Sequence, residues 1–137
     1  MTNFEIGERL LAEAEECYRE MLDALDRRSW NLVIRRAQEV VELSLKAVLK
    51  AMGIEYPKRH DVGDVFKETC VRKGITFIRL SDLDEIEEIS SYLARERSPA
   101  FYMERTYGEE EARKAKGDAS KVFRLSKSLF EFLRSNG

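Results

Sequence analysis

Proline, glycine, cysteine and histidine are all scarce in this chain of 137 residues. Two prolines and seven glycines leave few positions that interrupt a helix, so the sequence predicts long helices between them. The two cysteines, Cys17 and Cys70, form no closely spaced motif, and we expect reduced core thiols. Glu39 and Glu42 lack a Glu-x-x-His partner elsewhere in a chain with one histidine, so we expect neither a carboxylate metal centre nor a cofactor.

Neither an excess of one charge nor a long apolar run is present. The 24 Lys and Arg side chains nearly balance the 26 Asp and Glu side chains, which gives a net charge of -2. Strong nucleic-acid binders usually carry a basic excess, so the overall charge indicates no particular partner. No stretch of about 18 apolar residues exists, and the first ten residues carry acids where a signal peptide is basic. We therefore expect a cytoplasmic protein with no membrane association, folded as a single domain over residues 1–137.

The most informative segment runs from Trp30 to Val62. When successive residues are placed about 100° apart, its first part has a broad apolar helical face. The residues on this face are Trp30, Val33, Ile34, Ala37, Val40, Val41, Ser44, Val48, Ala51 and Met52. We interpret Glu39, Glu42 and Lys46, on the narrow polar stripe, as a surface ion-pair ladder rather than a polar site between helices. A helix with so wide an apolar face belongs at the centre of a bundle.

Apolar periodicity and capping residues predict five helices. The first three cover residues 3–28, 29–53 and 61–74, with Asn3 and Ser29 as N-caps. Gly53 and Pro57 mark the end of the second helix, and the third is short.

The remaining boundaries depend on two capping boxes and a proline. We expect a capping box headed by Ser81 to begin the fourth helix and Pro99 to end it. A second box, headed by Thr106, begins the last helix, which runs nearly to the end of the chain. Residues 75–80 resemble a strand in composition but have no second strand to pair with, so we expect a packed linker. The predicted fold is all-α, an antiparallel four-helix up-and-down bundle with an additional short helix.

Two irregular segments, residues 54–62 and 97–108, are the expected locations of a functional site, since sites tend to lie on loops held by rigid elements. In the first, Lys58, Arg59 and His60 could bind phosphate at the start of the third helix. We favour the simpler interpretation, in which His60 and its neighbour cap that helix.

In the second segment, arginines alternate with aromatic side chains, a composition that can hold an extended nucleotide by charge and stacking. These residues are Arg95, Arg97, Phe101, Tyr102, Arg105 and Tyr107. In the alternative, the loop is solvated and its aromatic rings fold back on the end of the bundle. The residues fit both arrangements equally well.

A recurring pattern lies along the second predicted helix and the loop after it. Alanines alternate with Glu and Lys, a glycine ends the helix, and a proline and a His-Asp pair follow: Ala37, Glu42, Lys46, Ala47, Leu49, Gly53, Pro57, His60 and Asp61. Tyr92, Arg97 and Pro99 precede the second loop. This pattern resembles the HEPN family, the higher-eukaryote and prokaryote nucleotide-binding domains. The resemblance implies a homodimeric four-helix bundle, often encoded beside a small nucleotidyltransferase as a toxin-antitoxin-like pair.

The resemblance also implies where an RNase site would lie. Family members that are metal-independent RNases share an Arg followed after four to six residues by a His, in which the Arg stabilises phosphate charge and the His transfers a proton. Counted from Arg95 and Arg97, the positions available to that His hold Ala100, Phe101, Tyr102, Met103 and Glu104. Tyrosine, with an ordinary pKa of about 10, is a poor general base at neutral pH.

We therefore predict a non-catalytic or degenerate HEPN protein that partners a small nucleotidyltransferase and binds a nucleotide or single-stranded RNA. The candidate binding residues are Arg95, Arg97, Tyr102, Arg105, Lys58, Arg59 and His60. One alternative is a metal-independent endoribonuclease that uses Arg97 and Tyr102, with His60 as a further candidate. Another is a structural adaptor without a ligand.

Overall fold

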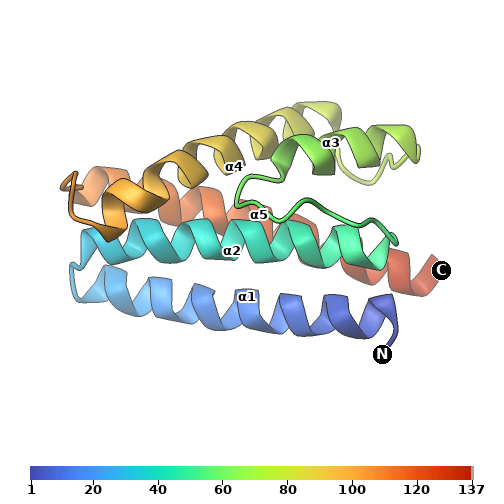
Figure 1. Ribbon diagram of the computed structural model, residues 1–137, viewed down its shortest axis with the longest axis horizontal. Helices are drawn as coiled ribbons and strands as arrows, with labels where there is room; N and C mark the ends of the chain where they lie inside the picture. The colour runs from blue at the N-terminus through green and yellow to red at the C-terminus, as the bar shows by residue number, and fades with distance from the viewer. Residues whose placement is uncertain (137) are drawn as a thin grey trace.

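The computed structural model describes residues 1–136, in which five α-helices and no strand occur. The four long helices are α1 (Asn3–Asp26), α2 (Trp30–Ala51), α4 (Leu80–Phe101) and α5 (Glu109–Asn136), and the short one is α3 (Gly63–Arg72). Successive long helices run in opposite directions (Figure 1). The all-α fold and the antiparallel helix packing predicted from the sequence are confirmed.

Helix α2 is the central helix and contacts α1, α4 and α5 (Figure 1). Its buried residues cover most of its circumference: Val33, Ile34, Ala37, Gln38, Val40, Val41, Ser44, Leu45, Ala47, Val48 and Leu49. Burying a Val, Leu or Ile side chain contributes roughly 1.5–3 kcal/mol, so α2 supplies a large part of the stabilising core. None of the helices within residues 1–136 is both long enough and apolar enough to span a bilayer.

The first helix begins one residue earlier than predicted. Thr2, not Asn3, is the N-cap: its hydroxyl accepts a hydrogen bond from the Glu5 N–H, and the Glu5 carboxylate accepts one from the Thr2 N–H, both at 3.1 Å. This reciprocal box satisfies two backbone donors, whereas a cap by Asn3 alone would satisfy fewer. Helix α2 begins after Ser29 as predicted, although the Ser29 hydroxyl makes no capping hydrogen bond.

Both predicted ends of the fourth helix are wrong. Helix α4 begins after Arg79, whose extended backbone makes it the N-cap, so Ser81 lies inside the helix. Pro99 also lies inside it, two residues before its end. A proline lacks the N–H that would bond to the carbonyl four residues earlier, here that of Arg95, and its ring crowds that carbonyl; with only two helical residues left after Pro99, the helix need not continue past this disturbance. The chain therefore completes its last turn after the proline.

The last helix begins at Glu109 without the predicted capping box headed by Thr106. The backbone N–H of Gly108 instead donates to the carboxylate of Glu111 at 3.2 Å. A glutamate three residues after the cap can serve this backbone donor whatever residue heads the helix.

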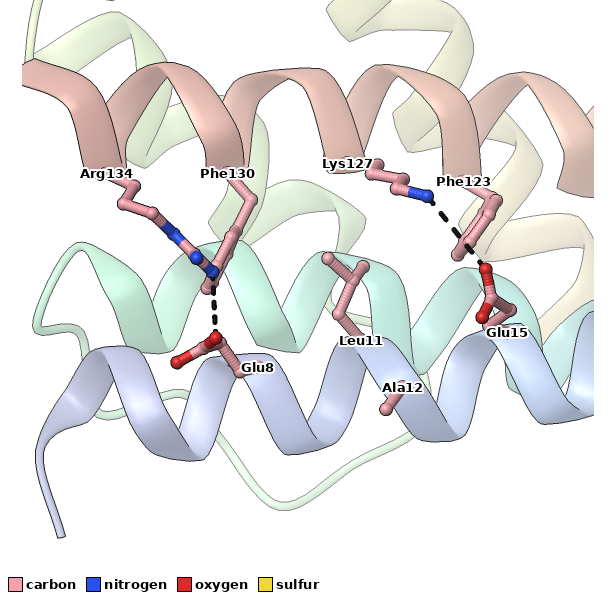
Figure 2. Close-up of a pocket in the computed structure, with 8 residues that line it drawn as sticks. All are labelled: Glu8, Leu11, Ala12, Glu15, Phe123, Lys127, Phe130 and Arg134. Atoms are coloured by element: carbon pink, nitrogen blue, oxygen red, sulfur yellow. Dashed lines mark ion pairs between the residues drawn. The ribbon is translucent and has the colours of Figure 1, made fainter.

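Helices α1 and α5 lie side by side along a shallow pocket of about 180 Å³ (Figure 2). Its apolar residues are Leu11, Ala12, Phe123 and Phe130. Arg134 pairs with Glu8 at 3.0 Å, and Lys127 lies 3.9 Å from Glu15, so two ion pairs cross between the helices. Exposed pairs of this kind contribute about 0.2–1 kcal/mol each, and the first and last helices are held mainly by their apolar contacts.

Candidate functional site

Arg97 lies near the C-terminal end of α4, where this helix faces α2. Its guanidinium donates a hydrogen bond to Gln38 Oε1 at 2.6 Å and lies 3.7 Å from the carboxylate of Glu39. The Arg97 side chain is 34% exposed. Side chains of α2 therefore orient the guanidinium of a side chain that is only partly buried.

Glu42, one turn further along α2, contacts three other side chains. Its Oε1 accepts a hydrogen bond from Gln38 at 2.9 Å and lies 2.9 Å from His60 Nδ1, and its Oε2 accepts one from Lys46 at 2.7 Å. Burial alone would raise the pKa of the Glu42 carboxyl, but these three hydrogen bonds lower it below its usual 4.5. Glu42 is therefore ionised at neutral pH and can only accept hydrogen bonds.

These side chains form what we call the α2–α4 polar cluster, which consists of Gln38, Glu39, Glu42, Lys46, His60 and Arg97. The interpretation of the polar stripe as a surface ion-pair ladder is wrong for Glu42 and Lys46, whose side chains are only 15% and 12% exposed. The stripe is covered because α4 packs on α2 and the connection between α2 and α3 runs back across α2 (Figure 1).

The adjacent residues His60 and Asp61 hold this connection to two different helices. His60 reaches Glu42 on α2, whereas Asp61 Oδ1 accepts hydrogen bonds from the Ser90 hydroxyl on α4 at 2.8 Å and from the backbone N–H of Gly63 at 3.1 Å. A Cβ atom on Gly63 would lie 2.7 Å from the Cβ of Ser90, so glycine permits this close approach of α3 to α4. The third helix begins at Gly63, later than predicted, with Asp61 satisfying its first backbone N–H.

A pocket of about 280 Å³ opens beside the cluster, lined by His60, Ala94, Arg97, Ser98, Phe101 and Tyr102. We call it the Arg97 pocket. Phe101 and Tyr102 are 53% and 67% exposed, and their rings meet edge to face with centroids 4.9 Å apart. The Arg35 guanidinium lies 4.6 Å over the Phe101 ring. The pocket thus combines an arginine, an imidazole and two solvent-exposed aromatic rings.

The other candidate residues of the two loops lie outside the Arg97 pocket. Arg95 lines a separate hollow whose acidic residues are Asp61, Asp64, Glu87 and Glu88. Arg59 pairs with both carboxylate oxygens of Asp64, at 3.0 and 2.9 Å, and Lys58 is exposed. The structure therefore brings only His60, of the three basic residues in the first loop, to the pocket.

Arg105 is held in the connection between α4 and α5 by two carboxylates. It lies 2.6 Å from Glu96, pairs with Glu111, and covers the ring of Tyr107 at 4.6 Å. Tyr107 is buried and donates a hydrogen bond to the Glu96 carboxylate, and burial together with this hydrogen bond raises the pKa of its phenol. Tyr107 is thus folded back on the bundle, as one of the two predicted arrangements has it, whereas Phe101 and Tyr102 at the pocket are exposed.

Two amide side chains of α2 organise the site and were not predicted from the sequence. Asn31 donates to the carbonyl of Arg105 at 2.8 Å and accepts from the N–H of Tyr107 at 3.1 Å, which fixes the α4–α5 connection. Gln38 bridges the arginine of the pocket and Glu42. It is the only glutamine in the chain and lies next to buried positions, four residues before Glu42. That placement was the signal in the sequence that could have identified Gln38 as part of the site.

The arrangement can bind an anion and a planar ring. An ionised Glu42 requires the proton of its contact with His60 to lie on Nδ1, which leaves Nε2 as an acceptor when the imidazole is neutral. Arg97 can donate to a phosphate oxygen, and Tyr102 can stack on a base. Within residues 1–136, no three His, Cys, Asp or Glu side chains are grouped closely enough to hold a metal ion.

Fold and pocket together define a helical-bundle domain with a polar, arginine-containing site at the end of its fourth helix. The HEPN domain model matches residues 8–129, which include every residue of the α2–α4 polar cluster and the Arg97 pocket. The chain therefore belongs to the HEPN domain family. No curated protein and no solved structure shows a significant match to it.

Proposed function

We propose that this protein binds a nucleotide or single-stranded RNA in the Arg97 pocket and is the non-catalytic partner of a small nucleotidyltransferase. The observation that supports ligand binding is the meeting of Arg97, His60 and an exposed Tyr102 ring around one pocket of about 280 Å³. The pairing with a nucleotidyltransferase rests on membership in the HEPN domain family.

Each side chain has a distinct role in this proposal. Arg97 is oriented by Gln38 and keeps donors free for a phosphate oxygen. His60 contributes a second polar contact, and Tyr102 stacks on the base. Because Tyr102 occupies the position of the family's RNase histidine and is a poor base, the bound ligand is not cleaved.

The binding test compares two arginines of the same helix. We expect Arg97→Ala to weaken binding of a labelled single-stranded pentanucleotide roughly 10- to 100-fold, since a hydrogen bond to a charged group contributes about 1.5–3 kcal/mol. Arg95→Ala is the matched control, because Arg95 is exposed on α4 and lines a different hollow. Fluorescence anisotropy measures the affinities, and thermal melts confirm that both variants are folded. Equal binding by Arg97→Ala and wild type would contradict the proposed site.

The partner test is independent of the ligand. We expect a small nucleotidyltransferase to be encoded next to this protein and to co-purify with it when both are expressed together. A neighbouring gene of another class, or separate elution of the two proteins, would contradict the pairing and leave the pocket to be judged by the binding test.

A second candidate function is a metal-independent endoribonuclease, favoured by the contact of 2.9 Å between His60 and Glu42. In this scheme His60 Nε2 takes the proton of the RNA 2′-hydroxyl as the 2′ oxygen attacks phosphorus, and Arg97 stabilises the added charge. The bond from phosphorus to the 5′ oxygen breaks and leaves a 2′,3′-cyclic phosphate; the leaving oxygen takes a proton from solvent. Glu42 holds the imidazole in orientation.

Cleavage of a labelled single-stranded RNA in the presence of a chelator separates the two candidates. A non-catalytic protein leaves the RNA intact, whereas Tyr102→His recreates the family's Arg and His spacing and should gain cleavage. The ribonuclease candidate instead requires cleavage by wild type that falls about 10²- to 10⁴-fold in His60→Ala, the usual contribution of a general base.

A further inference from the structure

Met103 occupies an unusual position in the α4–α5 connection, directly after the C-cap of α4. Its φ of 56° is left-handed, which is uncommon for a residue with a side chain, and the residue after a C-cap in this conformation is usually glycine. The Glu104 N–H donates to the Pro99 carbonyl at 2.9 Å and closes the turn around it. The Met103 side chain is 64% exposed, so neither core packing nor backbone preference explains a methionine here.

The contact that Met103 does make is with the side chain of Asn31. The Asn31 Nδ2 atom carries two hydrogens, but three acceptors lie within hydrogen-bond distance of it. They are the carbonyl of Ala100 at 3.2 Å, the carbonyl of Arg105 at 2.8 Å and Met103 Sδ at 3.3 Å. Asn31 Oδ1 accepts a hydrogen bond from the Tyr107 N–H at 3.1 Å. One side chain at the start of α2 thus holds both ends of the connection (Figure 1).

This arrangement is balanced only because the sulfur is a weak acceptor. A thioether accepts hydrogen bonds poorly, so the two hydrogens of Asn31 serve mainly the two carbonyls. Oxidation to the sulfoxide adds a polar oxygen to the sulfur, and the flexible methionine side chain can turn this oxygen toward the Asn31 nitrogen. Two hydrogens would then face three good acceptors, and the bonds to the carbonyls of Ala100 and Arg105 would weaken.

We propose that Met103 is a site of oxidation by hydrogen peroxide, and that its sulfoxide draws the Asn31 amide away from the α4–α5 connection and loosens it. In this step the O–O bond of the peroxide breaks and one oxygen atom is transferred to Sδ. The sulfur is oxidised by two electrons, and the peroxide is reduced to water. The inference requires no ligand. Tyr102, which lines the Arg97 pocket, directly precedes Met103, so loosening the connection also loosens one wall of that pocket.

The four methionines of the chain allow a test of selectivity within one protein. Met103 and Met1 are exposed, Met52 is partly buried and Met21 is fully buried. On treatment of the full chain with hydrogen peroxide, followed by peptide mapping with mass spectrometry, we expect Met103 and Met1 to be oxidised well before Met52 and Met21. Oxidation of Met103 no faster than that of Met21 would overturn the proposal at its first step.

Amide hydrogen exchange, resolved by residue with NMR, measures the loosening. The Tyr107 N–H is protected by its bond to Asn31 Oδ1, so its exchange should be roughly 2- to 10-fold faster after oxidation, the effect of weakening one hydrogen bond on local opening. Met103→Gln places an amide oxygen where the sulfoxide oxygen would lie and should accelerate this exchange without peroxide. Thermal melts establish that each variant is folded.

Met103→Leu is the matched control, because it keeps an apolar side chain, lacks the sulfur and can still be oxidised at Met1. Its Tyr107 exchange rate should be the same before and after peroxide treatment. An unchanged rate in oxidised wild type would show that the sulfoxide does not compete for Asn31. Equal acceleration in treated Met103→Leu would assign the effect to another methionine, and either result would overturn the inference.

Discussion

Replacing Gln38 with methionine would remove the side chain that joins Arg97 to Glu42. Gln38 is 2% exposed, accepts a hydrogen bond from Arg97 at 2.6 Å and donates one to Glu42 at 2.9 Å. Methionine is close to glutamine in volume and length and adapts to irregular packing, so Gln38→Met removes the two hydrogen bonds with little change in shape. We expect a folded protein of lower stability.

The magnitude follows from what each partner retains. A hydrogen bond to a charged group contributes about 1.5–3 kcal/mol. Arg97 keeps its proximity to Glu39 and its contact with water, and Glu42 keeps two other donors, so the combined loss should fall at the low end, roughly 2 kcal/mol. For a domain of this length, 1 kcal/mol corresponds to about 3–5 °C in Tm, and Gln38→Met should melt about 6–10 °C below wild type.

Thermal melts followed by circular dichroism measure this difference, with urea unfolding as a second estimate. Glu16→Met is the control, because Glu16 is 62% exposed and, among residues 1–136, pairs only with Arg19 on the surface of α1. We expect the control to melt within about 2 °C of wild type. A Tm for Gln38→Met equal to that of the control would refute the reasoning and show that the cluster does not stabilise the fold.

Three further predictions concern packing, pH and assembly. Gly63→Ala should destabilise the protein by about 1–3 kcal/mol, because its Cβ would lie 2.7 Å from Ser90 and 3.0 Å from the backbone of Glu87. Gly117→Ala, whose Cβ would have no neighbour within 4 Å, should stabilise α5 by up to about 1 kcal/mol. Urea midpoints of both variants equal to that of wild type would contradict both predictions. The pKa of Glu42 in the folded protein lies below 4.5, so its stabilising effect is complete above that pH and is lost as the pH falls through the lowered value. Glu42→Gln should therefore lose less stability than wild type between about pH 6 and pH 3, and parallel pH profiles would exclude this role. We also predict a homodimer, so light scattering should give twice the 16.0 kDa of the chain, and a monomer mass at micromolar concentration would show that the prediction is wrong.

The helices could be predicted because many residues determine each of them. The apolar face of the second predicted helix includes Val33, Val40 and Val48, all fully buried in α2, and no single substitution would have hidden that pattern. Helix ends depend on one or two hydrogen bonds. Thr2 and Asn3 are both good caps, and only the reciprocal bond with Glu5 decides between them.

The candidate site was harder to predict because its residues come from three distant segments. Arg97 and Tyr102 could be selected from the sequence, but the path of the connection that carries His60 could not be predicted from it. That path depends on Asp61 bonding to Ser90 and on the close packing at Gly63. Local sequence also could not show that Glu42 is covered, since burial of a polar stripe depends on which helix packs over it.

Chemical-shift mapping of ligand binding tests the central claim, that the Arg97 pocket is the binding site, most directly. Titrating the dinucleotide ApA, a short single-stranded RNA, into isotopically labelled protein should shift the side-chain resonances of Arg97, His60 and Tyr102, and leave those of Arg95 and Arg105 unchanged. Shifts centred on Arg95 or Arg105 would contradict the account, because they would place the ligand on the acidic hollow of α4 or on the α4–α5 connection.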